Sequence, residues 1–250
     1  MVEIRRVINP LDPVIGAFGK LQRRVYFEAD MLMPASVIRM MLSVPMIGRS
    51  NFFLVAEESF RGASREESFR GASRVEDGKL LGGTVFHYFA KPNTGLSSFM
   101  GVAPEARGRG IARKLHQARF ATLDEAAGGK VEGVFIDVVN PERLTPEELE
   151  AERRVGFDPV TRRKVFRALG FRQVDVEYQQ PVGGPGGGPV TNMDLLYCPH
   201  EPAETVPTAL VVETLRAYWT PWLGPGAAKR HAEALRRRAK GQVLALLPPI

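Results

Sequence analysis

The chain has 250 residues, of which 44% are hydrophobic and 25% are charged. These proportions are typical of a folded soluble protein and exclude a largely disordered chain. Its 34 Lys and Arg exceed its 28 Asp and Glu, so the formal net charge is +6, which raises the question of an anionic ligand. The single cysteine, Cys198, excludes an intramolecular disulfide framework and indicates a reducing compartment.

The sequence shows no signal for membrane insertion. No apolar run approaches the ~20 residues that a membrane-spanning helix requires. The first residues, MVEIRRVINP, lack the apolar stretch of a signal peptide. We therefore expect a cytoplasmic protein without a membrane partner.

Hydrophobic periodicity predicts alternating strands and helices along the first 200 residues. Apolar runs predict strands at residues 2–9, 51–57, 80–89, 96–102, 131–139, 172–180 and 193–197. Apolar residues spaced by three and four predict helices at residues 11–33, 35–46, 110–127 and 159–169. Thr145 and Glu148 have the spacing of a capping box, which adds a short helix. We interpret residues 1–200 as one α/β domain.

Two segments between these strands are predicted to be loops. The nine residues EESFRGASR at 57–65 recur unchanged at 66–74, a period too short for a solenoid, so we interpret them as a duplication tolerated in an exposed loop. An alternative is that the arginines of the repeat bind an anion. The glycine-rich segment at 183–189 precedes a strand rather than a Lys-[Ser/Thr] helix, which favours a hairpin loop over a phosphate-binding loop.

The last fifty residues, 201–250, are predicted to form a helical extension. The pattern predicts helices at 205–219 and 227–246, separated by a Pro-Gly break. The second helix has an apolar stripe, formed by Ala232, Leu235, Ala239, Val243 and Leu246. Residues 225–242 carry +5 of the net charge, but no aromatic residues interleave the cations, as a nucleic-acid platform would require. We therefore expect docking on the domain or a homodimer through these helices rather than a nucleic-acid partner.

The turn between the strand at 96–102 and the helix at 110–127 carries the clearest chemical signal. Gly108 and Gly110 remove side chains where a ligand approaches the backbone. The helix that begins there directs unpaired N–H groups and a partial positive charge outward. Four cations surround the turn: Arg107, Arg109, Arg113 and Lys114. These features predict a site for an anionic group such as a pyrophosphate.

The same turn resembles the acetyl-coenzyme A motif of the GNAT acyltransferase superfamily. That motif, Arg/Gln-x-x-Gly-x-Gly/Ala, is matched by Arg107, Gly110 and Ala112. Residues 166–171, FRALGF, are similar to the family's Tyr-x-x-x-Gly-Phe segment. The order of the predicted elements is also similar to that of the family, so the resemblance covers about four fifths of the chain.

The resemblance implies a fold and a cosubstrate. The fold is α/β (α+β), a GNAT-like mixed, bent central sheet of about seven strands flanked by helices, plus a C-terminal helical extension. The sheet would split between the strands at 96–102 and 131–139, and acetyl-CoA would bind in the split. The residues implied to contact the coenzyme are Met100, Val102, Arg107, Gly108, Arg109, Gly110, Ile111, Ala112 and Phe166.

The resemblance further implies direct attack of an amine acceptor on the thioester. Asp137 is the candidate general base, because it lies in the strand where some relatives carry a catalytic Glu; a carboxylate on the strand's other face, paired with an arginine, is an equal alternative. Phe166 stands where the family often has a tyrosine that protonates the leaving thiolate. Tyr178 and Tyr197 are candidate acids in its place, and otherwise coenzyme A leaves as the thiolate. Weaker candidates on neighbouring strands are His87, Tyr88 and Ser98.

The sequence therefore predicts an N-acetyltransferase that uses acetyl-CoA. The alternative is an acyl-CoA-binding regulatory or nucleic-acid-associated module with little transferase activity, which Phe166 and the basic C-terminal segment favour. The four histidines lack metal-ligand spacing, so no metal is expected. Cys198 is predicted to be a packed cysteine at a strand end. Glu28 and Asp30 are placed to attract an amine, although a solvated helix end is the default interpretation.

Overall fold

The computed structural model describes residues 1–26, 32–58, 79–155, 158–181 and 188–248. Most of the nine-residue repeat and of the glycine-rich segment lie outside the described residues. Glu28 and Asp30, the two carboxylates predicted to attract an amine, also lie outside them.

The described strands form one nine-stranded sheet in the order β1-β2-β3-β4-β5-β7-β6-β9-β8. The strands are β1 (Val2–Arg6), β2 (Arg49–Glu58), β3 (Lys79–Phe89), β4 (Thr94–Val102), β5 (Gly133–Val139), β6 (Arg172–Val174), β7 (Met193–Pro199), β8 (Thr205–Pro207) and β9 (Val243–Leu247). The α-helices are α1 (Val14–Val25), α2 (Ala35–Ser43), α3 (Ile111–Ala127), α4 (Pro146–Arg154), α5 (Pro159–Ala168) and α6 (Thr208–Arg238). Since β4 and β5 are parallel and the other neighbours are antiparallel, the sheet is mixed, as predicted.

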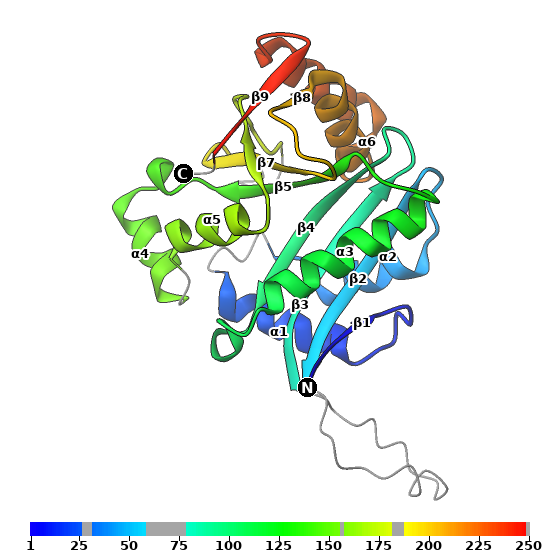
Figure 1. Ribbon diagram of the computed structural model, residues 1–250, viewed down its shortest axis with the longest axis vertical. Coiled ribbons are helices and arrows are strands. Elements are labelled where there is room, and N and C mark those ends of the chain that lie inside the picture. Colours follow the sequence, from blue (N-terminus) through cyan, green and yellow to red (C-terminus); the bar gives the residue numbers. More distant parts are fainter. Residues whose placement is uncertain (27–31, 59–78, 156–157, 182–187, 249–250) are drawn as a thin grey trace, which may run out of the picture.

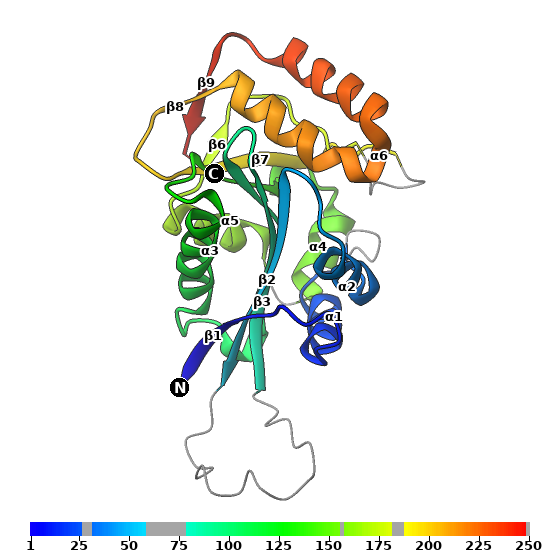
Figure 2. The same cartoon turned by 90° about the vertical axis from the view of Figure 1, so that its right-hand side faces the viewer.

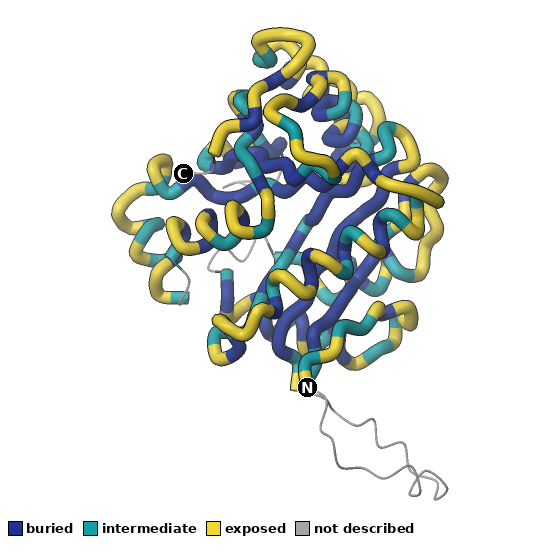
Figure 3. The backbone as a smooth tube through the Cα atoms, viewed as in Figure 1, coloured by how far each residue is buried: buried dark blue, intermediate teal, exposed yellow. Residues whose placement is uncertain are grey.

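Helices cover both faces of the half of the sheet formed by β1 to β4. Figure 2 shows α1 and α2 on one face and α3 on the other. The apolar residues of α1 recur at three and four, which places Phe18 in the core with its ring centroid 4.8 Å from that of Phe53 on β2. Leu115 and Leu123 of α3 are buried against the opposite face. The strands β2, β3 and β4 are therefore buried along most of their length (Figure 3).

The sheet bends where β4 meets β5. These strands pair only through Gly95 with Val134 and Leu96 with Phe135. Beyond Leu96, β4 remains paired with β3 and β5 remains paired with β7, so the two halves of the sheet diverge (Figure 1). This geometry agrees with the predicted split. It leaves the C-terminal half of β4 with an edge to which no described strand is paired.

The C-terminal segment differs from the helical prediction. Its helix α6 kinks at Gly224, at the predicted break, but it ends at Arg238, and the strands β8 and β9 flank it. The predicted stripe combined Val243 and Leu246 at helical spacing, whereas Val243 is 57% exposed and the buried residues are Leu244 and Leu246. That alternation has the period of a strand. The expected count of about seven strands is therefore wrong, and the described sheet has nine.

Two further boundaries also differ from the prediction. Of the described residues in the helix predicted at 11–33, those of Val14–Val25 form the helix α1. The strand predicted at 172–180 is a strand only over Arg172–Val174, and the chain then continues irregularly to Gln180, which forms a single bridge with Val190. The predicted capping box between Thr145 and Glu148 is confirmed at the start of α4.

Candidate functional site

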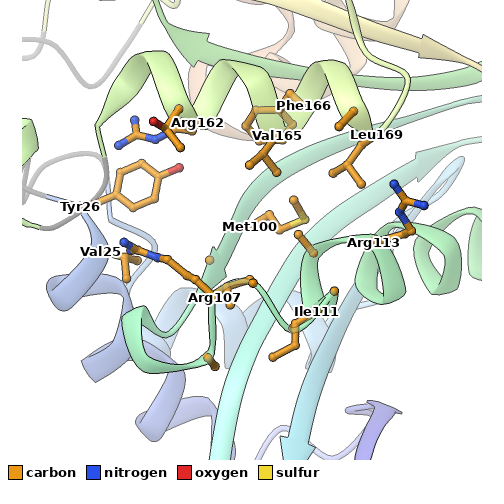
Figure 4. Close-up of a pocket in the computed structure, with 18 residues that line it drawn as sticks. Val25, Tyr26, Met100, Arg107, Ile111, Arg113, Arg162, Val165, Phe166 and Leu169 are labelled. Carbon is orange, nitrogen blue, oxygen red and sulfur yellow. The ribbon is translucent and has the colours of Figure 1, made fainter.

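A cavity of about 500 Å³ lies beside the edge of β4 that faces the split. The end of α1, the end of β4, the β4–α3 turn, the start of α3 and one face of α5 form its walls. Figure 4 shows Val165 and Leu169 pointing from α5 towards Met100 on β4. Most of the side chains that line it are apolar, and its charged lining residues are Arg107, Arg113 and Arg162, with no carboxylate among the described residues.

The β4–α3 turn places backbone rather than side chains at one end of this cavity. Gly108 and Gly110 have φ angles of 78° and 73°, in the left-handed region that costs other residues ~1–2 kcal/mol. Gly110 is also the N-cap of the 17-residue helix α3, and no described side chain caps it. The first N–H groups of α3 therefore supply donors and a partial positive charge beside the cavity.

The four cations predicted around this turn separate into two groups. Arg107 and Arg113 line the cavity, and burial lowers the pKa of Arg107. Arg109 turns away, since its Nη2 lies 2.6 Å from Glu58 Oε1 on β2. Lys114 is exposed and lies outside the cavity wall.

The structure brings together most of the residues predicted to contact the coenzyme. Arg109 is the exception, because its guanidinium pairs with Glu58. The other eight line the cavity: Met100, Val102, Arg107, Gly108, Gly110, Ile111, Ala112 and Phe166. Their contacts with a coenzyme stay a prediction.

Asp137 lies on β5, on the far side of the split, and is not part of the cavity wall. Its Oδ2 accepts a hydrogen bond of 2.9 Å from the Tyr178 hydroxyl. The partner of this carboxylate is therefore a phenol, not the arginine of the alternative interpretation. Burial raises the pKa of Asp137 above its ordinary value, and the Tyr178 hydrogen bond opposes that shift only in part.

The two candidate acids occupy different places. Tyr178 is 1% exposed, and burial raises the pKa of its hydroxyl well above the ordinary value. Tyr197 donates a hydrogen bond of 2.7 Å to the carbonyl of Glu132, before the start of β5, and its ring stacks on Phe135. Only Tyr178 is brought to Asp137.

The sequence analysis missed Tyr26 and Arg162, which line the cavity between α1 and α5. The Arg162 guanidinium lies 5.2 Å from the centroid of the Tyr26 ring and pairs with the buried carboxylate of Glu152. The negative charge of Asp137 helps to raise the pKa of Tyr26, after the larger effect of burial, so Tyr26 links the cavity to Asp137 electrostatically. A usable signal was present for Arg162, because it precedes Phe166 by four residues and so shares its face of the helix.

Three other expectations concern metals, membranes and the cysteine. Among the described residues, no group of three or more His, Cys, Asp or Glu is placed to hold a metal ion. No helix in the described part of the chain is long and apolar enough to cross a membrane. Cys198 is 7% exposed, and burial raises the pKa of its thiol to about 11, which agrees with a packed cysteine.

Comparison with known proteins places this site in a family context. Residues 47–143, from just before β2 to just beyond β5, match the sequence model of the Acetyltransferase (GNAT) family. No match was found among curated proteins. The family match confirms the predicted resemblance to GNAT proteins.

The chain is similar to solved structures of acetyltransferases at low sequence identity, and one of them reaches a TM-score of 0.50. A GNAT-family protein from Bacteroides thetaiotaomicron has 14% identity and a TM-score of 0.50, over 89% of this chain and 98% of its own. The ribosomal-protein-S18-alanine N-acetyltransferase from Escherichia coli has 12% identity and a TM-score of 0.42, over 81% and 96%. Arabidopsis thaliana NAA60 in complex with acetyl-CoA has 14% identity and a TM-score of 0.45, over 79% and 97%. The family match, with the shared fold, supports an acyltransferase.

Proposed function

We propose that this protein is an N-acetyltransferase that moves the acetyl group of acetyl-CoA to an amine. One observation carries the proposal: a single cavity joins the unpaired edge of β4 to the glycine turn at the N-terminus of α3. An extended cosubstrate needs both features: the edge of β4 for its uncharged arm and the glycine turn for its anionic end.

The two ends of the cavity suit the two ends of such a cosubstrate. The backbone N–H groups from Gly108 to Ala112, with Arg107 and Arg113, would hold the pyrophosphate; a helix end contributes ~0.3–1 kcal/mol per anionic group, and up to ~2 kcal/mol when partly buried. The apolar wall of α5 and the edge of β4 would hold the pantetheine arm. Backbone groups near Met100 and Val102 would align the thioester, and a donor that polarises its carbonyl is worth ~2.7–4 kcal/mol in other enzymes.

The reaction would be direct attack of the amine nitrogen on the thioester carbonyl carbon. A carbon–nitrogen bond forms, the carbon–sulfur bond breaks, and its electron pair leaves with sulfur as a thiolate. The nitrogen loses two protons in all: one before the attack, and a second, which passes to solvent, as the amide forms. An alkylammonium with a pKa of ~10 must first lose a proton, which costs ~4 kcal/mol at neutral pH. We assign that proton to Asp137, through a bridging water because Asp137 is not among the residues that line the cavity. Its raised pKa brings it closer to the value that suits a base at neutral pH.

The leaving thiolate needs no dedicated acid in this proposal. Tyr178 donates to Asp137, and its raised pKa makes it a poor proton donor to a thiolate whose acid has a pKa of ~8.5. Phe166 packs its ring edge-to-face on Phe171, with the centroids 5.5 Å apart, and carries no proton to give. Coenzyme A therefore departs as the thiolate.

Two measurements on the purified chain test the proposal. Calorimetric titration with acetyl-CoA should show saturable binding, and a thiol assay should show coenzyme A release that depends on an added amine from a panel of small amines and peptide N-termini. No coenzyme binding would overturn the proposal outright. Binding without release across the whole panel would favour the alternative of an acyl-CoA-binding module.

A further inference from the structure

Behind Asp137, four buried polar side chains form a cluster that we call the α6 relay: Tyr178, Gln180, Tyr218 and Trp219. The Tyr178 hydroxyl lies 2.9 Å from Asp137 Oδ2 and 3.2 Å from Gln180 Oε1. The Trp219 indole Nε1 donates to the same Gln180 oxygen over 2.7 Å. The helix α6 thus reaches the proposed base through one glutamine and one tyrosine.

The indole settles which way the glutamine amide faces. An indole N–H is a donor only, so the Gln180 atom beside it must be the oxygen. Gln180 also acts on the Tyr218 hydroxyl, whose pKa it lowers against the larger effect of burial. The indole therefore holds the Gln180 oxygen beside Tyr178 as a fixed acceptor.

A fixed acceptor on one side of Tyr178 and a carboxylate on the other compete for one phenolic proton. When Asp137 is ionised, the Tyr178 hydroxyl donates its proton to the carboxylate. The Tyr178 oxygen then faces Gln180 Oε1 with no proton between the two oxygens. When Asp137 is protonated, it can donate to the Tyr178 oxygen while Tyr178 donates to Gln180, so every contact is satisfied. The orientation of the Gln180 amide therefore favours the protonated carboxyl.

We propose that Gln180, held in place by Trp219 of α6, is a positioning residue that controls the protonation of Asp137 through the Tyr178 hydroxyl. The inference rests on the proposed function in one respect, which is that Asp137 acts as the base. It gives the C-terminal helix a part in the reaction beyond packing, although none of its residues would touch substrate.

The other titratable groups around Asp137 come from several elements: Tyr26 follows α1, Glu152 lies on α4, Arg162 on α5 and Tyr218 on α6. The charge of Asp137 contributes to raising the pKa values of Tyr26, Tyr178 and Tyr218. Arg162 and its partner Glu152 lie beyond Tyr26 and act on that phenol. Ser98 of β4 donates to the Tyr218 hydroxyl over 3.3 Å and carries no charge. Trp219→Phe and Gln180→Met, the two deciding variants below, leave all of these side chains in place.

The test measures the pKa of Asp137 directly, by carbon-13 NMR of labelled aspartate carboxyls, with Asp137→Asn identifying the signal. In Trp219→Phe the Gln180 amide is free to turn its nitrogen towards Tyr178, so Tyr178 donates fully to the carboxylate. The pKa should fall by roughly 0.5–1 unit. Gln180→Met removes the competing acceptor and should act in the same direction, whereas Tyr178→Phe removes the donor to the carboxylate and should raise the pKa.

Trp222→Phe is the matched control, because Trp222 is in the same helix but 42% exposed. It should leave the pKa of Asp137 unchanged. An unchanged or raised pKa in Trp219→Phe, or an equal shift in Trp222→Phe, would overturn the inference; should Trp219→Phe fail to fold by circular dichroism, Gln180→Met decides in the same way. The acid limb of the rate profile should move to lower pH with the pKa. A chain that shows the NMR shift but transfers no acetyl group would refute the proposed function alone, since the NMR readout requires no turnover.

Discussion

The cavity and the α6 relay are formed by different residues and are assembled in different ways. The cavity draws most of its walls from two short stretches of sequence, 100–113 and 161–169. The relay joins Asp137 to four residues that are distant in the sequence. Tyr178, Gln180, Tyr218 and Trp219 follow Asp137 by 41, 43, 81 and 82 positions. Local sequence therefore specifies the proposed coenzyme site, whereas the tertiary fold specifies the environment of the proposed base.

The two regions also differ in their electrostatics. The cavity presents backbone donors and arginines, which suit a ligand that brings its own negative charge. The relay surrounds one carboxylate with phenols, an amide and an indole, and no described cation pairs with Asp137. A buried carboxylate without a cation gains a raised pKa, which is a property that a base requires and a phosphate site does not.

The largest expected effect comes from removing the carboxylate on the relay side. Asp137→Asn should lower kcat by about 100- to 10,000-fold, the usual range for a general base. Since the pKa of Asp137 is raised, the wild-type rate should increase with pH through that pKa, and the loss in the variant should be greatest above it. Stopped assays of coenzyme A release across pH 5 to 9 measure this.

Calorimetry on the same variant tests whether the two regions are separate. Because Asp137 does not line the cavity, acetyl-CoA affinity should remain that of the wild type. A parallel loss of affinity would show that the carboxylate supports the coenzyme site, and an unchanged rate would remove Asp137 as the base.

The division between local and tertiary information also explains which parts of the fold could be predicted. The helices α1 and α3 could be recognised from the sequence because each has a continuous apolar stripe. The strand β9 could not, because its five residues VLALL fit a helix or a strand equally, and only their pairing with β6 and β8 decides the period. Short apolar runs are ambiguous for this reason.

The site divides in the same manner. The residues of the glycine turn could be identified because a left-handed backbone and a helix start leave a local signature, at Gly108 and Gly110. The partner of Asp137 could not, because Tyr178 follows β6 in an irregular segment that the sequence suggested was strand. The ion pair that turns the Arg109 side chain away from the cavity could not be predicted, because it involves Glu58, 51 positions away.

A second prediction disrupts the cavity side alone. Gly110→Glu puts a carboxylate at the proposed pyrophosphate position and should weaken acetyl-CoA binding roughly 100-fold or more, because like charges a few ångströms apart repel by several kcal/mol at a protein surface. Gly128→Glu is its matched control at the other end of α3: both glycines have positive φ, and both have open space beside an added Cβ. The control should cost similar stability and keep the affinity, measured by calorimetry and thermal unfolding. Equal losses of affinity in both variants would show that strain in α3, rather than charge at the turn, is responsible.

The smallest effect is expected at Phe166, in the wall of the cavity. Phe166→Tyr adds a hydroxyl beside the cavity at the position where the family motif often has a tyrosine. If the thiolate departs unaided, as its acid pKa of ~8.5 permits, kcat should change by less than about tenfold, well below the ~100- to 10,000-fold that a required acid supplies. Phe166→Leu separates packing from proton donation, since it removes the ring without adding a donor. An increase in kcat near 100-fold in the tyrosine variant would show that thiolate departure limits the wild-type rate. The rate would then depend on a proton donor in the cavity wall rather than on the relay.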